Sequence, residues 1–212
     1  MKLFKTLLFF LFIMIATVSL AYSQQTPSLQ SDEKRISFTV NGGVAIPVAP
    51  FFFRQNWNVG PGIEAGIGYR IRSNSLLRLN VSYYNFGFTN SGFQNFQNLP
   101  PEANISSSNA ETMTLGLNAI YEYQRMETDL VPYLTIGAGL FRFLPSDIQY
   151  SAEGETTTFE VESETSLMFN SGIGFLYPLR QTTSVFLEAK LVTGLFVDRR
   201  TQYIPISFGI RF

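Results

Sequence analysis

The sequence predicts an all-β protein: an eight-stranded antiparallel up-and-down transmembrane β-barrel that follows a cleaved signal peptide. Apolar and polar residues alternate in eight segments of about ten residues, the length that a tilted strand needs to cross a bilayer. One face of these segments carries scarcely a charge, whereas the other face mixes glycines with ionic side chains. A membrane barrel requires this pattern, because its outer face meets lipid and its inner face is polar.

The composition excludes several classes of function. The 212 residues include 15 Lys and Arg against 16 Asp and Glu, without the cation excess that broad nucleic-acid binding needs. With 45% apolar residues and 21 Phe, the chain is too apolar to be mainly disordered. Cys and His are both absent, which removes disulfides, thiolate and imidazole metal sites, and cysteine or histidine catalysts. We therefore expect no enzyme activity, no cofactor, and no catalytic or metal site.

The first 35 residues predict export and then a short leader. Residues 1–23 begin with Lys2 and Lys5, continue through the apolar run 7–21 and end at a cleavage-like Ala21-Tyr22-Ser23, the pattern of a secretory signal peptide. A permanent inner-membrane anchor is the alternative, but the run is shorter than the roughly 20 apolar residues of a spanning helix. Residues 24–35 are polar and predict a mobile periplasmic lead-in. The barrel domain then covers residues 36–212.

Strands are predicted wherever period two holds. They lie at residues 37–46, 63–72, 77–84, 113–123, 133–141, 167–177, 185–192 and 204–212. Tight connections at 72–75, 124–129 and 178–182 alternate with long polar ones at 47–59, 89–109 and 144–164, and the last connection, 198–202, is short. This alternation is typical of hairpins in an up-and-down barrel. No helix and no second domain is evident.

Two of these segments depart from regular alternation. Asn41-Gly42 could form a hairpin turn, but we expect a continuous strand, because the two halves would make very short hairpin arms. Phe86 and Phe88 fall out of phase with Tyr83, which indicates either a bulge or the end of the third strand.

The polar face predicts which way the barrel faces. We expect its ionic residues to pair inside the lumen, because an eight-stranded barrel is filled by side chains and tolerates buried charge only when it is paired. These residues are Glu64, Arg70, Arg78, Glu122, Glu188, Lys190 and Arg211. Aromatic residues near strand ends predict girdles at the membrane interfaces. They are Tyr69, Tyr83, Tyr121, Tyr123, Tyr177, Tyr203 and Phe212.

Several segments carry a family resemblance. Residues 131–139 (VPYLTIGAG) have a P-Y-x-x-x-G-x-G pattern, residues 171–177 read SGIGFLY, and residues 186–190 read FLEAK. In this order they resemble strands of the small outer-membrane β-barrel proteins of double-membraned bacteria, the porin-like group that includes opacity-type surface proteins. Phe208, Ile210 and Phe212 are similar to the C-terminal signal read by the outer-membrane assembly machinery. The resemblance implies an outer-membrane location, with lipid, lipopolysaccharide and that machinery as partners, and it implies no set of functional residues.

The sequence gives little support for a catalytic or cation-binding site among the ionic residues of the barrel. Glu64, Glu122 and Glu188 could suggest an acid–base pair or a cation site, but the four interior cations supply matching counter-charges and favour ion pairs. Lys190 is the only lysine of the barrel proper, and we expect it to be ion-paired rather than a partner of a nucleophilic serine.

The long loops are the remaining candidates for contacts. Phe51, Phe52, Phe53 and Trp57 of the first loop predict an outer anchoring belt or a partner patch. Phe93 and Phe96 of the second loop could belong to an adhesive surface, pack on the barrel rim, or lie in a mobile solvated loop. The third loop alternates at 156–161, which predicts that strands extend above the membrane. Its acidic character predicts either a Ca²⁺-bridged or cation-attracting rim or repulsion from lipopolysaccharide phosphates. Its acidic residues are Asp147, Glu153, Glu155, Glu160, Glu162 and Glu164.

Together these features predict an integral outer-membrane protein with a structural or surface-interaction role through its extracellular loops. Both termini are expected in the periplasm. A narrow channel for protons or small solutes, lined by the charged interior, is the first alternative, whereas a wide pore is excluded by the strand count. A soluble periplasmic ligand-binding barrel is the second alternative. It is disfavoured because its outer surface would be largely Gly, Asn and Ser wrapped around too many bulky residues.

Overall fold

The computed structural model describes residues 35–90, 104–107, 109–123, 129–152, 155–159, 163–180, 182–197 and 200–212. The predicted signal peptide and all of the lead-in except Arg35 lie outside these residues, as do Phe93 and Phe96. Helices long and apolar enough to cross a bilayer are not found in the described part of the chain.

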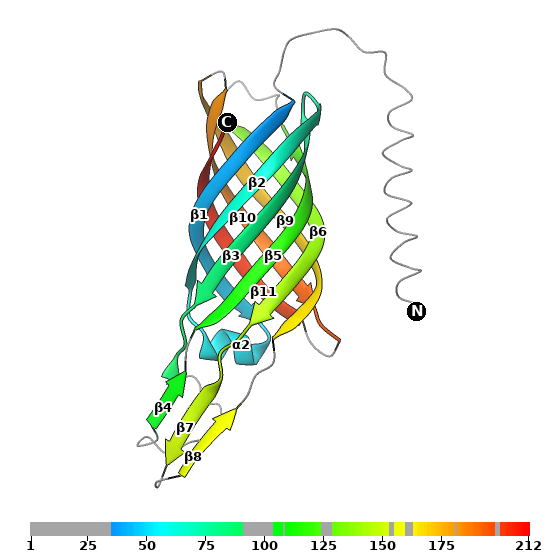
Figure 1. Cartoon of the computed structure of the whole chain (residues 1–212). Coiled ribbons are helices and arrows are strands. Elements are labelled where there is room, and N and C mark those ends of the chain that lie inside the picture. The colour runs from blue at the N-terminus through cyan, green and yellow to red at the C-terminus, as the bar shows by residue number, and fades with distance from the viewer. Residues whose placement is uncertain are drawn as a thin grey trace. The chain divides into compact units, whose positions relative to one another are not determined.

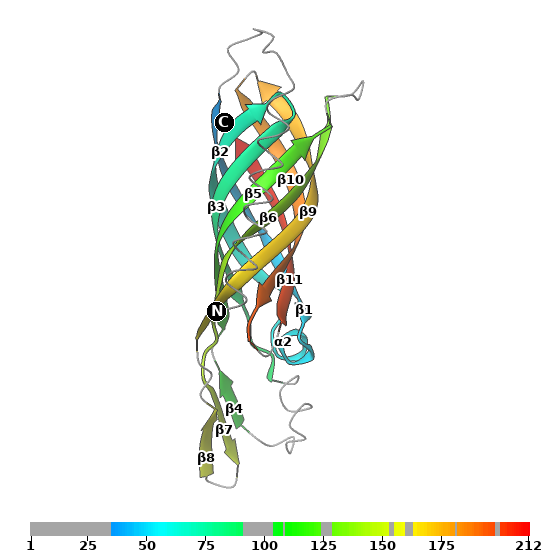
Figure 2. The same cartoon turned by 90° about the vertical axis from the view of Figure 1, so that its right-hand side faces the viewer.

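Eight long strands form a closed antiparallel barrel (Figures 1 and 2). They are β1 (Ile36–Ala49), β2 (Gly60–Arg72), β3 (Ser75–Phe86), β5 (Ala110–Glu122), β6 (Val131–Leu144), β9 (Glu164–Arg180), β10 (Thr183–Leu195) and β11 (Arg200–Arg211). Each barrel strand pairs with the next along the chain, and β1 closes the barrel on β11, with Thr39 opposite Arg211. The predicted eight-stranded up-and-down barrel is confirmed.

The structure settles the predictions for the two irregular segments. β1 runs without interruption through Asn41 and Gly42, as expected. The register between β3 and β5 is continuous as far as Phe86, so this position is a strand end and not a bulge. Phe86 is fully buried, in phase with the inward-facing Tyr84 rather than with the outward-facing Tyr83.

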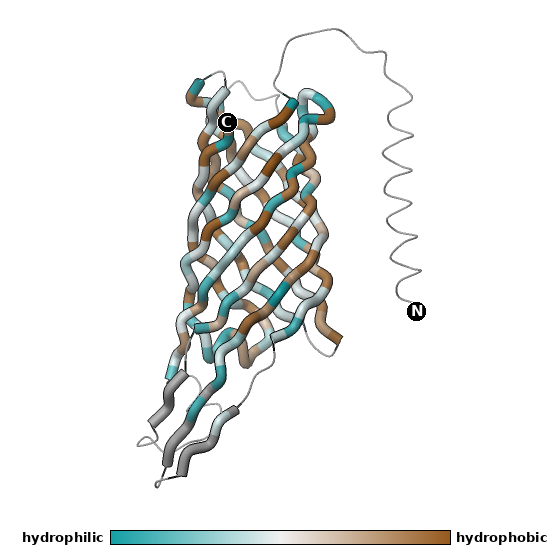
Figure 3. The backbone as a smooth tube through the Cα atoms, viewed as in Figure 1, coloured by the Kyte–Doolittle hydropathy of each residue, from teal (hydrophilic) through white to brown (hydrophobic). Residues whose placement is uncertain are grey.

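Side chains alternate between the lumen and the outside along every barrel strand. On β10, Glu188 is 1% exposed while its neighbour Leu187 is 51% exposed. On β11, Ser207 is 2% exposed while Phe208 is 59% exposed. Figure 3 shows the resulting alternation of hydropathy along the strands. Apolar side chains therefore point outward and polar side chains point into the lumen, which is the arrangement of a barrel that lies in lipid.

The two ends of the barrel differ. The turn end, where the tight connections and both ends of the barrel domain lie, carries outward-facing aromatics. These are Tyr69, Tyr121, Tyr123, Tyr177 and Phe212, all between 44% and 48% exposed. At the opposite, loop end, Tyr83 is half-buried. Tyr203 was expected in a girdle and is instead fully buried, because it shares the inward parity of Pro205 and Ser207 on β11.

The loop end also carries elements that the sequence did not predict. The first long connection contains a short helix, α2 (Phe51–Asn56), where no helix was expected. The Thr89 amide donates to the Asn56 carbonyl at 2.8 Å, and the Asn58 amide donates to the Gly87 carbonyl at 2.8 Å, so this connection is fixed to the extension of β3. Six residues are too few to reveal a helical period in the sequence.

A second, smaller sheet is built from the long connections. It contains β4 (Asn104–Ser107), β7 (Ile148–Ala152) and β8 (Glu155–Phe159), in the order β4-β7-β8 with antiparallel pairing. Figure 1 shows these strands beyond the loop end of the barrel, on the same side as α2. The alternation at 156–161 overlaps β8 but does not lengthen a barrel strand.

Candidate functional site

Four ionic side chains meet inside the lumen and form the central charge cluster: Glu64 of β2, Arg78 of β3, and Glu188 and Lys190 of β10. Arg78 Nη2 donates to both carboxylate oxygens of Glu188, at 2.9 and 2.8 Å. Lys190 Nζ donates to Glu64 Oε2 at 2.7 Å and lies 3.0 Å from Glu188 Oε1. All four residues are at most 4% exposed. Two carboxylates face two cations, so the cluster is internally neutral, as burial of charge requires.

Neighbouring residues hold this cluster in place. Tyr133 of β6 donates its hydroxyl to Glu188 Oε2 at 3.0 Å, which adds a third wall of the barrel to the network. The Tyr133 ring lies against Gly174 of β9, where a Cβ atom would clash with the ring. The Arg78 guanidinium also lies over the Phe186 ring, 6.0 Å from its centroid. Glycine at position 174 therefore makes room for the ring that carries the hydroxyl.

A second group lies toward the turn end and is called the turn-end charge cluster. Glu122 of β5 accepts from Arg70 Nη1 at 3.0 Å and from Arg211 Nη1 at 2.6 Å. Arg70 Nη1 also donates to the Ser73 carbonyl at 2.6 Å. The Arg70 and Arg211 side chains keep 19% and 12% exposure, so this group is partly hydrated. All seven ionic residues of the predicted network thus lie in the lumen, but in two groups.

Aromatic rings fill the lumen at the loop end and form the aromatic plug, which consists of Phe53, Trp57, Tyr84, Phe86, Phe141, Phe143 and Tyr203. The Phe53 ring of α2 lies 5.1 Å from the Phe86 ring and 5.6 Å from the Phe143 ring, edge to face in both cases. Such pairs add to the gain from removing large apolar surfaces from water. α2 therefore places Phe53, and Trp57 directly after it, among rings that the strands contribute at this end of the barrel.

The plug changes the interpretation of the first loop. Phe53 and Trp57 are 2% and 3% exposed, so they are not available as an anchoring belt or a partner patch, contrary to the prediction. Burial inside the lumen removes their rings from water more completely than a surface position would. Phe52 packs partly buried against the plug, and Phe51 remains 55% exposed.

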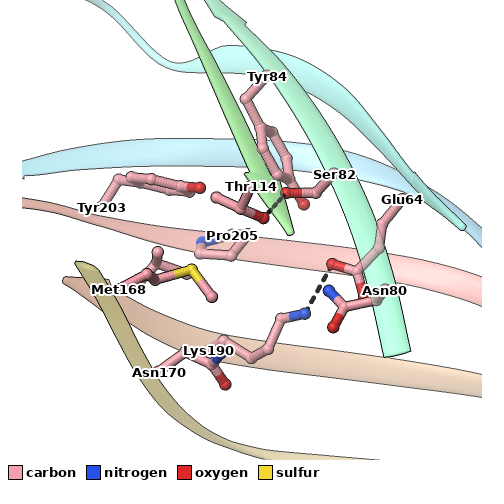
Figure 4. Close-up of a pocket in the computed structure, with 11 residues that line it drawn as sticks. Glu64, Asn80, Ser82, Tyr84, Thr114, Met168, Asn170, Lys190, Tyr203 and Pro205 are labelled. Atoms are coloured by element: carbon pink, nitrogen blue, oxygen red, sulfur yellow. Dashed lines mark hydrogen bonds and ion pairs between the residues drawn. The ribbon is translucent and has the colours of Figure 1, made fainter. Parts of the chain in front are cut away.

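Between the plug and the central charge cluster lies a small polar cavity of about 10 Å³. Figure 4 shows the side chains around it, which come from opposite walls of the barrel. Ser82 and Thr114 share a hydrogen bond of 2.6 Å there. Asn118 donates to Asn80 nearby.

Several of these residues had no role assigned from the sequence. Tyr84, Tyr133, Asn80 and Asn118 fall on the polar face of their strands, so alternation points them into the lumen, where they lie, but it does not tell which partners they meet there. Tyr203 was assigned to the interface girdle, and this prediction is wrong: it shares the inward parity of Pro205 and Ser207.

The acidic third loop is only partly described. Asp147 is exposed and Glu164 is half-buried, while the side chains of its other four acidic residues lie outside the described residues. Groups of three or more carboxylates able to hold a metal ion are not found among the residues that the structure describes. The cation-attracting rim therefore stays a prediction.

Taken together, the lumen is packed at successive heights by aromatic rings, ion pairs and further apolar side chains. Below the central charge cluster, Leu76, Ile120, Leu176 and Phe186 form a second apolar group with Tyr133. Lys190 forms ion pairs with two carboxylates, Glu64 and Glu188, as expected for a structural lysine rather than the partner of a nucleophilic serine. The arrangement stabilises a closed barrel, because apolar rings and paired charges occupy the lumen at each of these heights.

Comparisons with known proteins agree with this architecture. Residues 10–212 match the family described as "Outer membrane protein beta-barrel domain". The structure is similar to that of Neisserial surface protein A, with a TM-score of 0.56, 15% identity, and coverage of 84% of this chain and 96% of that one. It is also similar to a major outer membrane protein from Thermus thermophilus, with a TM-score of 0.51, 11% identity, and coverage of 84% and 98%. None of the curated proteins compared with this chain matches it.

Proposed function

Because this chain belongs to the outer membrane protein beta-barrel domain family and lies in the outer membrane, we propose that it is a closed, non-conducting scaffold. Its role is to display the segments of its loop end at the cell surface for contact with other molecules. The observation that carries the proposal is the filled lumen, in which the aromatic plug lies above the central charge cluster. A barrel filled in this way retains its membrane-spanning wall and its ends as surfaces that a partner can reach.

The unequal ends of the barrel support display at one side. The turn end has short connections and an aromatic girdle, whereas the loop end has α2 and the sheet of β4, β7 and β8. Short periplasmic turns and longer extracellular loops are typical of outer-membrane barrels. We therefore place the loop end outside the cell, with residues 1–23 removed as a signal peptide and residues 24–35 leading into the periplasmic end.

The same orientation gives roles to two further sets of residues. Phe208, Ile210 and Phe212 face outward at the C-terminus, at 59%, 42% and 48% exposure, where assembly machinery could read them before insertion. Arg142 of β6 and Arg200 of β11 are exposed near the loop end. Cations on a barrel's outer face belong at headgroup level, so these two fit contact with lipopolysaccharide.

The role is proposed to be non-enzymatic. The whole chain lacks His and Cys, and the buried carboxylates that the structure describes are engaged by Arg or Lys. General acid–base catalysis needs a titrating group within reach of a substrate. The ion-paired groups of the lumen have no such access.

Conductance measurement tests the closed scaffold against the narrow channel. Purified full-length protein is reconstituted into planar bilayers, and the expected result is no steady single-channel current above that of protein-free bilayers. Reproducible current steps would favour the channel for protons or small solutes and would overturn the proposal.

Surface labelling on intact cells tests the orientation. The chain has no natural Cys, so Val197→Cys at the loop end and Thr182→Cys at the turn end each provide one reactive thiol. Val197 is 100% exposed, and Thr182 is also exposed. A membrane-impermeant maleimide is expected to label position 197 in intact cells and position 182 only after the outer membrane is opened. The reverse pattern would contradict display of the loop end.

A further inference from the structure

We propose that the barrel wall contains a built-in site of local opening, between β10 and β11, where Pro205 lies opposite Lys190. The pairing between these strands stops after Ala189 and resumes at Val192 without a change of register, so the two positions between them are not paired with β11. Proline has no backbone N–H and cannot donate to a neighbouring strand, which explains why the ladder is interrupted at Pro205.

The missing hydrogen bond lies on the β10 side of Pro205. β1, the other neighbour of β11, keeps Ala45 paired with Pro205. In an antiparallel ladder, hydrogen-bonded and non-hydrogen-bonded pairs alternate, so each residue exchanges its N–H and C=O bonds with only one of its two neighbouring strands. The nitrogen of Pro205 therefore faces β10, and the Lys190 carbonyl opposite it accepts no hydrogen bond from β11.

The position of this gap distinguishes it from the other irregularities of the barrel. Within the described residues, the shifts of strand register lie near strand ends, at 47–49, 70–72 and 183–184. Lys190, by contrast, is five residues along β10 from Val185, which pairs with the outward-facing Tyr177 at the turn end. This distance places the gap near the middle of the roughly ten residues with which a strand crosses a bilayer.

The strands are held together less firmly at this gap than on either side of it. In the hydrocarbon region of a bilayer, backbone groups have to be satisfied within the protein, because bulk water does not replace a lost hydrogen bond. Only the bond from the Lys190 N–H to the Pro205 carbonyl can join the strands here, whereas a regular pair of this kind exchanges two. The Lys190 side chain adds no contact to β11, since its ammonium group pairs with Glu64 and Glu188.

The lumen beside the gap has room for a small movement. Pro205 is buried on the inner face of β11, and both Pro205 and Lys190 line the polar cavity of about 10 Å³ (Figure 4). A cavity of this size admits a small displacement of the Pro205 ring but no passage through the wall. Opening at this site therefore exposes the Lys190 backbone and leaves the barrel closed to solutes.

Amide hydrogen exchange of the full-length protein in lipid nanodiscs, followed by NMR, tests the proposal. The Lys190 amide is expected to exchange faster than the amides of Glu188 and Val192, which are paired with β11 on either side of the gap. Pro205→Ala supplies the missing N–H and should slow exchange at Lys190 roughly two- to tenfold, the factor that corresponds to one net backbone hydrogen bond. Exchange at Lys190 that is no faster than at these neighbours, or that Pro205→Ala leaves unchanged, would overturn the proposal.

Pro132→Ala is the matched control. Pro132 makes a similar half pair at the turn end, where the Tyr123 amide donates to the Pro132 carbonyl at 2.9 Å and the Tyr123 side chain is 46% exposed. This variant should leave exchange at Lys190 unchanged. An equal slowing of Lys190 in both variants would show a general effect of proline removal and would overturn the assignment to the gap.

Infrared spectroscopy of protein with carbonyl-labelled lysine provides an independent readout. The Lys190 carbonyl band should move to lower wavenumber in Pro205→Ala, because a carbonyl that accepts a hydrogen bond absorbs at lower wavenumber. The other lysines, Lys2, Lys5 and Lys34, lie far from position 205 in the sequence and cancel in the difference spectrum. An unshifted band would overturn the proposal, and if Pro205→Ala does not fold, the comparison of Lys190 with Glu188 and Val192 in the wild type decides alone.

Discussion

Removal of the Glu188 carboxylate charge should strongly destabilise the barrel. Glu188→Gln keeps nearly the same shape but loses the charge that two cations share. Arg78 would lose its charged partner and one of the two hydrogen bonds that it donates to Glu188, and Lys190 would keep only Glu64 as an ion-pair partner. Removing one partner of a buried ion pair typically costs about 3–5 kcal/mol, because it leaves uncompensated buried charge. All four residues of the central charge cluster are nearly inaccessible to water, so this range applies without a discount for solvent screening.

Glu122→Gln provides the matched comparison in the turn-end charge cluster. Its partners Arg70 and Arg211 keep 19% and 12% side-chain exposure and can recover hydration when the charge is lost. We expect a smaller loss of about 1–3 kcal/mol, the range for hydrogen bonds to charged groups and for one unsatisfied buried group. The difference between the two variants isolates the effect of burial on the same chemical change.

The assay is urea-induced unfolding in lipid vesicles. Trp57 is the only tryptophan and lies in the aromatic plug, so its fluorescence reports whether the lumen is packed. The slower gel migration of heated samples reports barrel closure independently. Added salt should change the Glu188→Gln loss little, because ions do not screen buried pairs. A loss for Glu188→Gln no larger than that for Glu122→Gln would refute the reasoning.

Three further substitutions test the plug, the lipid face and the glycine that faces a ring. Phe53→Ala should lower the free energy of unfolding by about 3–5 kcal/mol, because it leaves a cavity in the aromatic plug. Phe51→Ala, at an exposed position, should change it by no more than about 0.5 kcal/mol; equal effects would contradict the plug. Leu187→Arg should lower the free energy of unfolding in vesicles by less than the roughly 2–4 kcal/mol of a cation at the bilayer midplane, because Leu187 lies only two residues from the level of Tyr177; an unchanged stability would argue against lipid contact. Gly174→Ala should lower the free energy of unfolding by about 1–3 kcal/mol, because the added methyl group would overlap the Tyr133 ring. An unchanged urea midpoint would be inconsistent with that contact.

Period two explains why the strands could be predicted. A strand places successive side chains on opposite faces, so alternation at positions such as Leu187 and Glu188 reports both the strand and the direction of each side chain. The orientation of the barrel followed from the same signal, because charges on one face and aliphatic residues on the other distinguish lumen from lipid. The prediction for Tyr203 was wrong because the alternation seen from residue 204 onward was not extended back to Tyr203, which belongs to the same strand, β11.

Partnerships across the lumen could not be predicted in this way. Alternation gives the face of a residue but not its height, which depends on the stagger between strands accumulated around the barrel. The sequence therefore indicated one network, whereas Glu122 lies with Arg70 and Arg211, apart from the pair Arg78 and Glu188. The local signal around α2 is also too short, and its rings are ordered by contacts with β3 and β6 that lie far away in the sequence.

The central claim is that aliphatic side chains of the strands face hydrocarbon while the lumen is filled. Site-directed spin labelling of Leu187→Cys, with Val197→Cys as the aqueous control, tests it most directly, because the natural chain has no Cys. In lipid vesicles the label at 187 should relax strongly with oxygen, which concentrates in acyl chains, and weakly with a water-soluble metal complex. The label at 197 should behave in the opposite way. A label at 187 that responds chiefly to the water-soluble reagent would contradict the account.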